Sequence, residues 1–168
     1  MLALVGASCG EAAPGNGRAG GSREASAKQL AVHSRDGVLT STFPIDVVVH
    51  EFEHSVGGTS ADGAFRLYLE HRPAEKLIRV AGATKDALVA RGWEISAERH
   101  YEAAIEVRSG KGKGNAQVTR VTWFVARAGR VLICEGIARD AQLERLDEPL
   151  KQRCERVELA PLEEPKPQ

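Results

Sequence analysis

The chain has 168 residues, which fits one domain of ordinary size with tails. Its 23 Lys and Arg residues balance 23 Asp and Glu residues, so the formal net charge is zero. This balance argues against a nucleic-acid binder and against attachment to a membrane through basic residues. No apolar run reaches the roughly 18 residues that a membrane-spanning helix needs.

Residues 1–9 (MLALVGASC) resemble the end of a bacterial lipoprotein signal, in which small residues precede the cysteine that receives the lipid. Ala7 and Ser8 meet this pattern, whereas Gly6 stands where leucine is usual. A full signal also needs a basic segment and an apolar stretch of roughly 7–15 residues, so we expect it to begin upstream of the first residue. Cys9 is therefore predicted to be lipidated; the alternative is an ordinary N-terminus with an incidental cysteine.

Residues 10–28 are rich in Gly, Ala and Ser and contain no large apolar side chain. Such a segment cannot offset its ordering entropy by burial, so we predict a flexible linker. The Pro- and charge-rich residues 160–168 are predicted to form a disordered tail. A single folded domain is expected at 29–159, exported to the bacterial cell envelope as a periplasmic or outer-membrane lipoprotein.

The domain opens with a predicted β-hairpin, in which residues 28–34 and 38–43 flank an Asp-Gly turn at Asp36. Residues 47–56 follow as a predicted strand because three consecutive valines lead into it and apolar and polar residues then alternate. A Gly-rich stretch leads to a second alternating strand at 64–72. The sheet is thus expected to begin with antiparallel neighbours.

A central helix is predicted over 75–91, where apolar residues recur at three- and four-residue steps. The side chains expected to pack on the sheet are Leu77, Val80, Ala81 and Leu88. A helix of this kind covers a sheet face with one apolar stripe.

The rest of the domain returns to the strand period from Trp93 onward. A hairpin of 118–127 and 130–139 follows, and its turn would set Trp123 opposite Cys134. Asp147 is predicted to cap a final helix. Strands outnumber helices, so the fold class is predicted as α+β, an antiparallel sheet with a central helix and a C-terminal helix packed on it.

The order of these elements resembles the PsbP-like fold. The resemblance rests on the opening DGVLTSTFP at 36–44, two strands, a helix that ends in Arg91-Gly92-Trp93, a meander and a closing helix. The chain departs from that pattern in its short first section and in a final helix without the usual Ser-Phe ending. The resemblance implies a binding or assembly module without catalytic residues.

Two cysteines remain once Cys9 is set aside. Cys134 lies on a predicted strand, and Cys154 lies on the core-facing side of the last helix. If that helix covers the sheet, the two Cα atoms should lie within about 7 Å, the reach of a disulfide. An exported chain could oxidise the pair; two separate buried thiols are the alternative.

The segment His50-Glu51-Phe52-Glu53-His54 satisfies the H-E-x-x-H pattern of zinc peptidases. On a helix, His50 and His54 would share a face and hold zinc, with Glu51 as general base. The surrounding sequence favours a strand, on which these histidines lie about 13 Å apart, too far for one ion. A third ligand at a diagnostic spacing is also missing, although Glu70, His71 and Asp62 are candidate substitutes.

Three functions follow from these observations. The first is a non-catalytic, lipid-anchored extracytoplasmic binding or assembly module, which needs no cofactor. The second is a small zinc metallopeptidase that uses His50, Glu51 and His54. The third is a structural subunit whose exposed sheet face pairs with a partner protein. Nucleic acid is not an expected partner.

Overall fold

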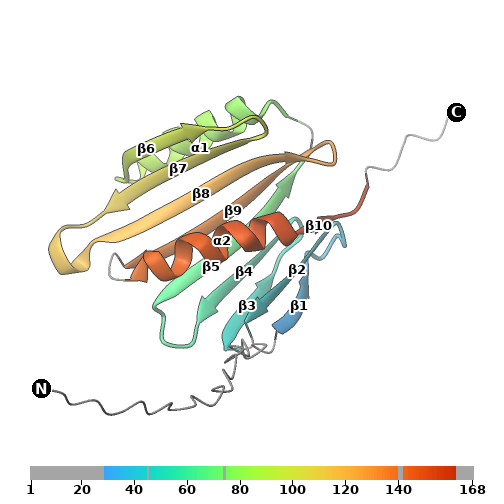
Figure 1. Ribbon diagram of the computed structural model, residues 1–168, viewed down its shortest axis with the longest axis horizontal. Helices are drawn as coiled ribbons and strands as arrows, with labels where there is room; N and C mark the ends of the chain where they lie inside the picture. Colours follow the sequence, from blue (N-terminus) through green and yellow to red (C-terminus); the bar gives the residue numbers. More distant parts are fainter. Residues whose placement is uncertain (1–28, 45, 74, 140–141, 162–168) are drawn as a thin grey trace, which may run out of the picture.

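A computed structural model describes residues 29–44, 46–73, 75–139 and 142–161, and it has the predicted α+β class (Figure 1). Two helices lie on opposite faces of a large antiparallel sheet, and a small second sheet lies beside one of them. The predictions for Cys9, for the linker at 10–28 and for most of the tail at 160–168 lie outside the described residues.

The large sheet has seven strands in the order β3-β4-β5-β9-β8-β7-β6, and all neighbours are antiparallel. These strands are β3 (Val47–Glu51), β4 (Ser55–Ser60), β5 (Phe65–Arg72), β6 (Glu94–His100), β7 (Ala104–Lys111), β8 (Val118–Arg127) and β9 (Arg130–Arg139). The small sheet has the order β1-β2-β10, with β1 (Gln29–His33), β2 (Leu39–Pro44) and β10 (Glu158–Leu159). The helices are α1 (Leu77–Ala90) and α2 (Glu144–Arg156), and a 3-10 turn, η1 (Gly114–Ala116), precedes β8.

One face of the large sheet is covered by α2 and by the small sheet. The main core lies in this layer because alternate residues of β5, β8 and β9 point into it. Trp123 lies opposite Cys134, as predicted, and Cys134 is joined to Cys154 of α2 by a disulfide with a Cα separation of 5.7 Å. The predicted docking of the last helix on the sheet is therefore confirmed.

The opposite face carries α1, which packs on β6, β7, β8 and β9 through a second apolar cluster. Val80, Ala81 and Leu88 are buried, and Leu77 packs at the edge of this cluster, as the helical period predicted. The part of this face over β3, β4 and β5 lies beyond the reach of the helix. Half of the sheet face is consequently left open.

Three sequence predictions need correction. Residues 47–56 do not form a single strand: the chain turns at Phe52–His54, so that β3 ends at Glu51 and β4 returns antiparallel to it. The glycines after Val56 continue β4 instead of forming a loop, because β4 pairs on both sides. The last helix begins at Glu144, so Asp147 is not its cap; cap signals locate a helix start only to within a few residues.

Candidate functional site

The open half of the sheet face forms a groove. It is floored by β4, β5 and β9, bounded on one side by α1, and has a volume of about 650 Å³. Small side chains of α1, Ala83, Thr84 and Ala87, line the helix side and leave the groove wide. The groove exists because α1 has only 14 residues and lies over one half of the sheet.

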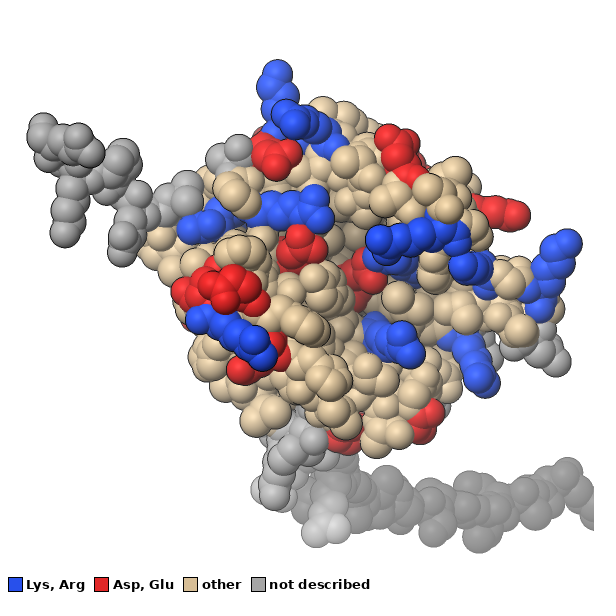
Figure 2. Space-filling view, turned by 180° about the vertical axis from the view of Figure 1, so that it is seen from behind, with Lys and Arg blue, Asp and Glu red and all other residues tan. Residues whose placement is uncertain are grey.

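Six charged side chains, four arginines and two glutamates, line this groove together with apolar and small residues. Figure 2 shows this face of the molecule, where Lys and Arg side chains lie around acidic side chains near its middle. Arg72 is paired with Glu70 at 2.6 Å. Arg66 and Arg91 are exposed and form no ion pair within the described part of the chain. The groove therefore offers two free guanidinium groups.

A buried ion pair lies at the floor. Arg120 of β8 donates a hydrogen bond to the carboxylate of Glu135 on β9, which is 7% exposed. The Arg120 Cζ also lies 5.6 Å from the centre of the Trp93 ring. Burial raises the pKa of Glu135 above its usual range, although Arg120 draws it down; the nearby Glu70 adds to the rise. The pair places a fixed guanidinium at the bottom of the groove.

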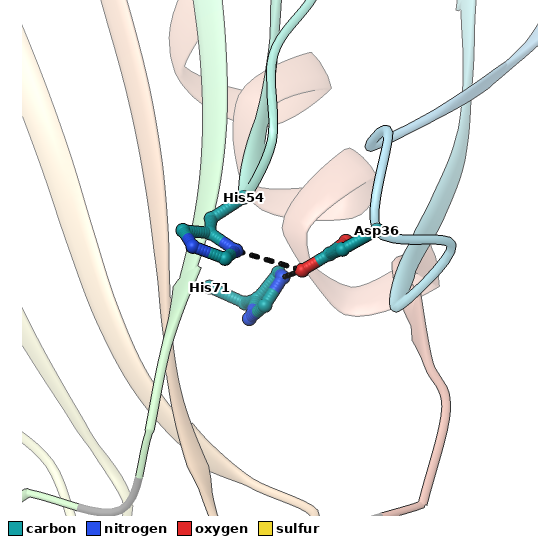
Figure 3. Close-up of side chains that lie close together, drawn as sticks. All are labelled: Asp36, His54 and His71. Atoms are coloured by element: carbon teal, nitrogen blue, oxygen red, sulfur yellow. Dashed lines mark hydrogen bonds and ion pairs between the residues drawn. The ribbon is translucent and has the colours of Figure 1, made fainter.

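A second group of titratable side chains lies at the end of β5, on the other face of the sheet. The Oδ2 atom of Asp36 lies 2.8 Å from Nδ1 of His54 and 2.7 Å from Nε2 of His71 (Figure 3). All three candidate ligand atoms lie within 4.8 Å of one another. We refer to Asp36, His54 and His71 as the His-Asp cluster.

Three separate segments bring these residues together. Asp36 lies in the β1–β2 turn, His54 lies in the β3–β4 turn, and His71 lies near the end of β5. Partial burial raises the pKa of Asp36, but hydrogen bonds from Ser34, His54, the Val38 N–H and His71 outweigh it and hold this pKa far below its usual range. Asp36 is therefore an ionised acceptor at neutral pH.

The H-E-x-x-H residues are not arranged as in a zinc peptidase. His50 is exposed on β3, on the groove side, and does not join the His-Asp cluster. Glu51 accepts a hydrogen bond at 3.3 Å from the backbone N–H of His33 and faces the small sheet. The zinc peptidase alternative fails on geometry, because the motif crosses a strand and a turn, not one face of a helix.

The H-E-x-x-H pattern includes His54 but neither of the other two residues of the His-Asp cluster. The sequence predicts Asp36 only as a turn residue and His71 only as one of three substitutes for a third ligand. No local pattern links them, since Asp36 is 35 residues from His71. Backbone hydrogen bonds from Arg35 to Phe52 and from Asp36 to Glu53 hold the two turns side by side, and no sequence pattern indicates them.

None of the helices within the described ranges is long and apolar enough to cross a membrane. No family model matches the sequence, and a comparison with curated proteins gives no match.

Comparison with solved structures shows the fold. The Ran-binding protein Mog1p of Saccharomyces cerevisiae is similar with a TM-score of 0.55 and 10% identity, over 81% of this chain and 97% of that chain. Cyanobacterial PsbP (CyanoP) of Synechocystis sp. PCC 6803 is similar with a TM-score of 0.54 and 8% identity, over 92% and 98% of the two chains. The predicted PsbP-like fold is therefore confirmed.

Proposed function

We propose that the protein is a non-catalytic binding module of the bacterial cell envelope, anchored by a lipid on Cys9, whose groove takes an acidic segment of a partner protein. The observation that carries this proposal is the groove itself, an open half of a sheet face with two arginines that form no ion pair among the residues described. The fold supports it in general terms, since the name of the similar Mog1p describes a protein that binds another protein.

Charge favours an acidic occupant. Four arginines and two glutamates line the groove, an excess of two positive charges in a chain whose net charge is zero. Arg66 and Arg91 can each pair with a carboxylate in the bidentate geometry that guanidinium groups favour. The half-buried Ile137 on the floor would contact the aliphatic parts of the same segment. An extended acidic peptide fits this combination of shape and charge.

Export is supported by two features. The Cys134–Cys154 disulfide is a bond that persists in oxidising compartments and is rare in reducing ones. Small residues precede Cys9, as expected before a lipid-bearing cysteine, and residues 10–28 have the composition expected of a flexible tether. Both features are consistent with a position outside the cytoplasm.

Binding can be tested with fluorescein-labelled acidic peptides, followed by fluorescence anisotropy, with basic peptides of the same length as the reference. The variant Arg66→Glu, combined with Arg91→Glu, should weaken acidic-peptide binding by tenfold or more. The matched control is Arg79→Glu, because Arg79 is an exposed arginine of α1 outside the groove. Equal binding of acidic and basic peptides, or equal loss in the control, would contradict the proposal.

The lipid anchor needs its own test. Mass spectrometry of the membrane fraction, after expression of the full gene in a bacterial host, should show a diacylglyceryl-modified cysteine at position 9. The variant Cys9→Ala should instead yield unmodified protein that leaves the membrane fraction. An intact, unmodified N-terminus on the wild-type protein would refute the anchor and leave the groove proposal standing.

A further inference from the structure

We propose that the His-Asp cluster is a binding site for a zinc ion, with a coordination position left open to solvent. Two imidazole nitrogens and one carboxylate oxygen are a donor set that zinc accepts in proteins. Three protein ligands leave a fourth position for water or another ligand, whereas closed structural zinc sites have four protein ligands. This site is separate from the groove, and it shares only His54 with the H-E-x-x-H pattern.

Hydrogen bonds orient the carboxylate of Asp36 toward the two histidines. The Oδ1 atom of Asp36 accepts hydrogen bonds from the Ser34 hydroxyl at 2.5 Å and from the Val38 N–H at 3.1 Å. These bonds fix the rotamer and leave Oδ2 facing both histidines. An outer hydrogen bond that orients a ligand is a regular feature of metal sites.

Backbone hydrogen bonds hold the three segments in register. The Asp36 N–H donates to the carbonyl of Glu53 at 3.1 Å, and the His71 N–H donates to the carbonyl of His54 at 3.0 Å. The β1–β2 turn, the β3–β4 turn and β5 are thus connected directly beside the three side chains. A site that exists before the ion binds loses less conformational entropy on binding.

The ligand atoms all lie within 4.8 Å of one another, and they must shift before they can hold one zinc ion at tetrahedral spacing. Ligands about 2.0–2.1 Å from a tetrahedral zinc lie about 3.3 Å from one another. The two nitrogens now lie 2.8 and 2.7 Å from Oδ2 of Asp36, so each must move outward by about half an ångström. Rotation of the imidazole of His54, whose side chain is 64% exposed, can supply much of this movement.

The two histidines differ in a way that suits ion entry. His71 is buried, with 3% of its side chain exposed, whereas His54 faces solvent. The second ring nitrogen of His71, Nδ1, is buried without a hydrogen-bond partner among the described residues. In the metal-free chain the ionised Asp36 accepts a hydrogen bond from Nε2 of His71, so this nitrogen carries the proton. Zinc binding at Nε2 would displace that proton, and the neutral ring would then carry its proton on Nδ1.

Titration of the metal-free chain without a histidine tag tests the site. Isothermal titration with zinc chloride should show one ion per chain, and cobalt(II) should give the visible absorption of a four-coordinate ion. Magnesium should not bind, because it prefers oxygen ligands. The variant His54→Ala, at an exposed position, should weaken zinc binding by tenfold or more, and Asp36→Asn should do the same.

His50→Ala is the matched control, since it removes an exposed histidine of the H-E-x-x-H pattern but leaves the His-Asp cluster intact. Its zinc affinity should stay within twofold of the wild type. Circular dichroism establishes that each variant is folded, and His54→Ala decides the question if Asp36→Asn does not fold. The proposal is overturned if the wild type shows no saturable binding, if His54→Ala binds like the wild type, or if His50→Ala loses as much affinity.

Discussion

Arg120 of β8 and Glu135 of β9 are diagonal neighbours in the sheet and form an ion pair under the groove, where the Trp93 ring lies near the guanidinium. Both residues line the groove that we propose as the binding site for an acidic peptide. Burying a carboxylate costs free energy that a single guanidinium does not fully recover. This imbalance is the reason that the pKa of Glu135 is raised.

The first prediction concerns the pH dependence that Glu135 adds to folding. Its pKa is higher in the folded chain than its usual value of 4.5, so the unfolded chain ionises first as the pH rises. The contribution of Glu135 to stability is thus present at low pH and is lost as the pH rises from about 4.5 through the folded pKa. Urea denaturation between pH 4 and pH 8 should show a smaller fall of the unfolding free energy in Glu135→Gln than in the wild type.

Glu98 provides the control of opposite sign. A hydrogen bond from Lys85 lowers the pKa of Glu98, helped by His100 and opposed by its slight burial. Its contribution is therefore present above its unfolded pKa and is lost as the pH falls toward the folded pKa. In the same experiment, Glu98→Gln should lose stability at neutral pH and little in acid. The same sign for both variants would contradict this account.

The second prediction concerns the disulfide. Cys134 and Cys154 are 20 residues apart in sequence, and a loop of that length stabilises the folded chain by about 3 kcal/mol. The double variant Cys134→Ala with Cys154→Ala should lose roughly this amount in urea denaturation. A thiol titration of the unfolded wild type should find the pair only after reduction. Free thiols in both samples, with no loss in the variant, would refute the bond.

Local patterns were enough to predict most of the fold. The helical period of 75–91 predicted α1 and its buried face, and the alternation in 118–139 predicted the register that sets Trp123 against Cys134. These features depend on neighbours in sequence. The reversal at Phe52–His54 was missed because the alternation of apolar and polar residues continues through it, so the turn leaves no break in the pattern.

The candidate sites depend on distant contacts, and the sequence pointed to a different set of residues. The H-E-x-x-H spacing pairs His50 with His54. In the structure His50 lies on β3 and His54 lies in the turn after it, so that only His54 belongs to the His-Asp cluster. Asp36 reaches His54 and His71 only because two turns pack together at one end of the sheet. The groove depends on where α1 ends over the sheet, which no periodicity specifies.

The third prediction concerns the packing of α1. Leu88 is 3% exposed between the helix and the sheet, so Leu88→Ala should destabilise the chain by about 2–5 kcal/mol. Ile78, which is 55% exposed on the same helix, is the matched control, and Ile78→Ala should change the unfolding free energy by less than about 0.5 kcal/mol. Similar losses in both variants would mean that α1 is oriented differently.

The last prediction concerns the contact between the two sheets. Gly58 of β4 faces the small sheet, and a Cβ added there would lie 2.5 Å from Val47 Cγ1 and 2.8 Å from the ring of Phe43. Phe43 is fully buried, so its ring has little room to move away. Glycine is needed at this position because the small sheet approaches the backbone of β4 too closely for any side chain.

Gly58→Ala should therefore destabilise the chain by about 1–3 kcal/mol, the usual cost of forcing extra volume into a packed core. Gly82 in the middle of α1 is the matched control, since an added Cβ meets nothing within 4 Å. Gly82→Ala should raise stability by about 0.5–1 kcal/mol, because alanine loses less backbone entropy in a helix. Thermal denaturation of the two variants should move in opposite directions from the wild type. A stabilising Gly58→Ala would show that Phe43 does not press against β4, and the packing of the small sheet on the large one would have to be revised.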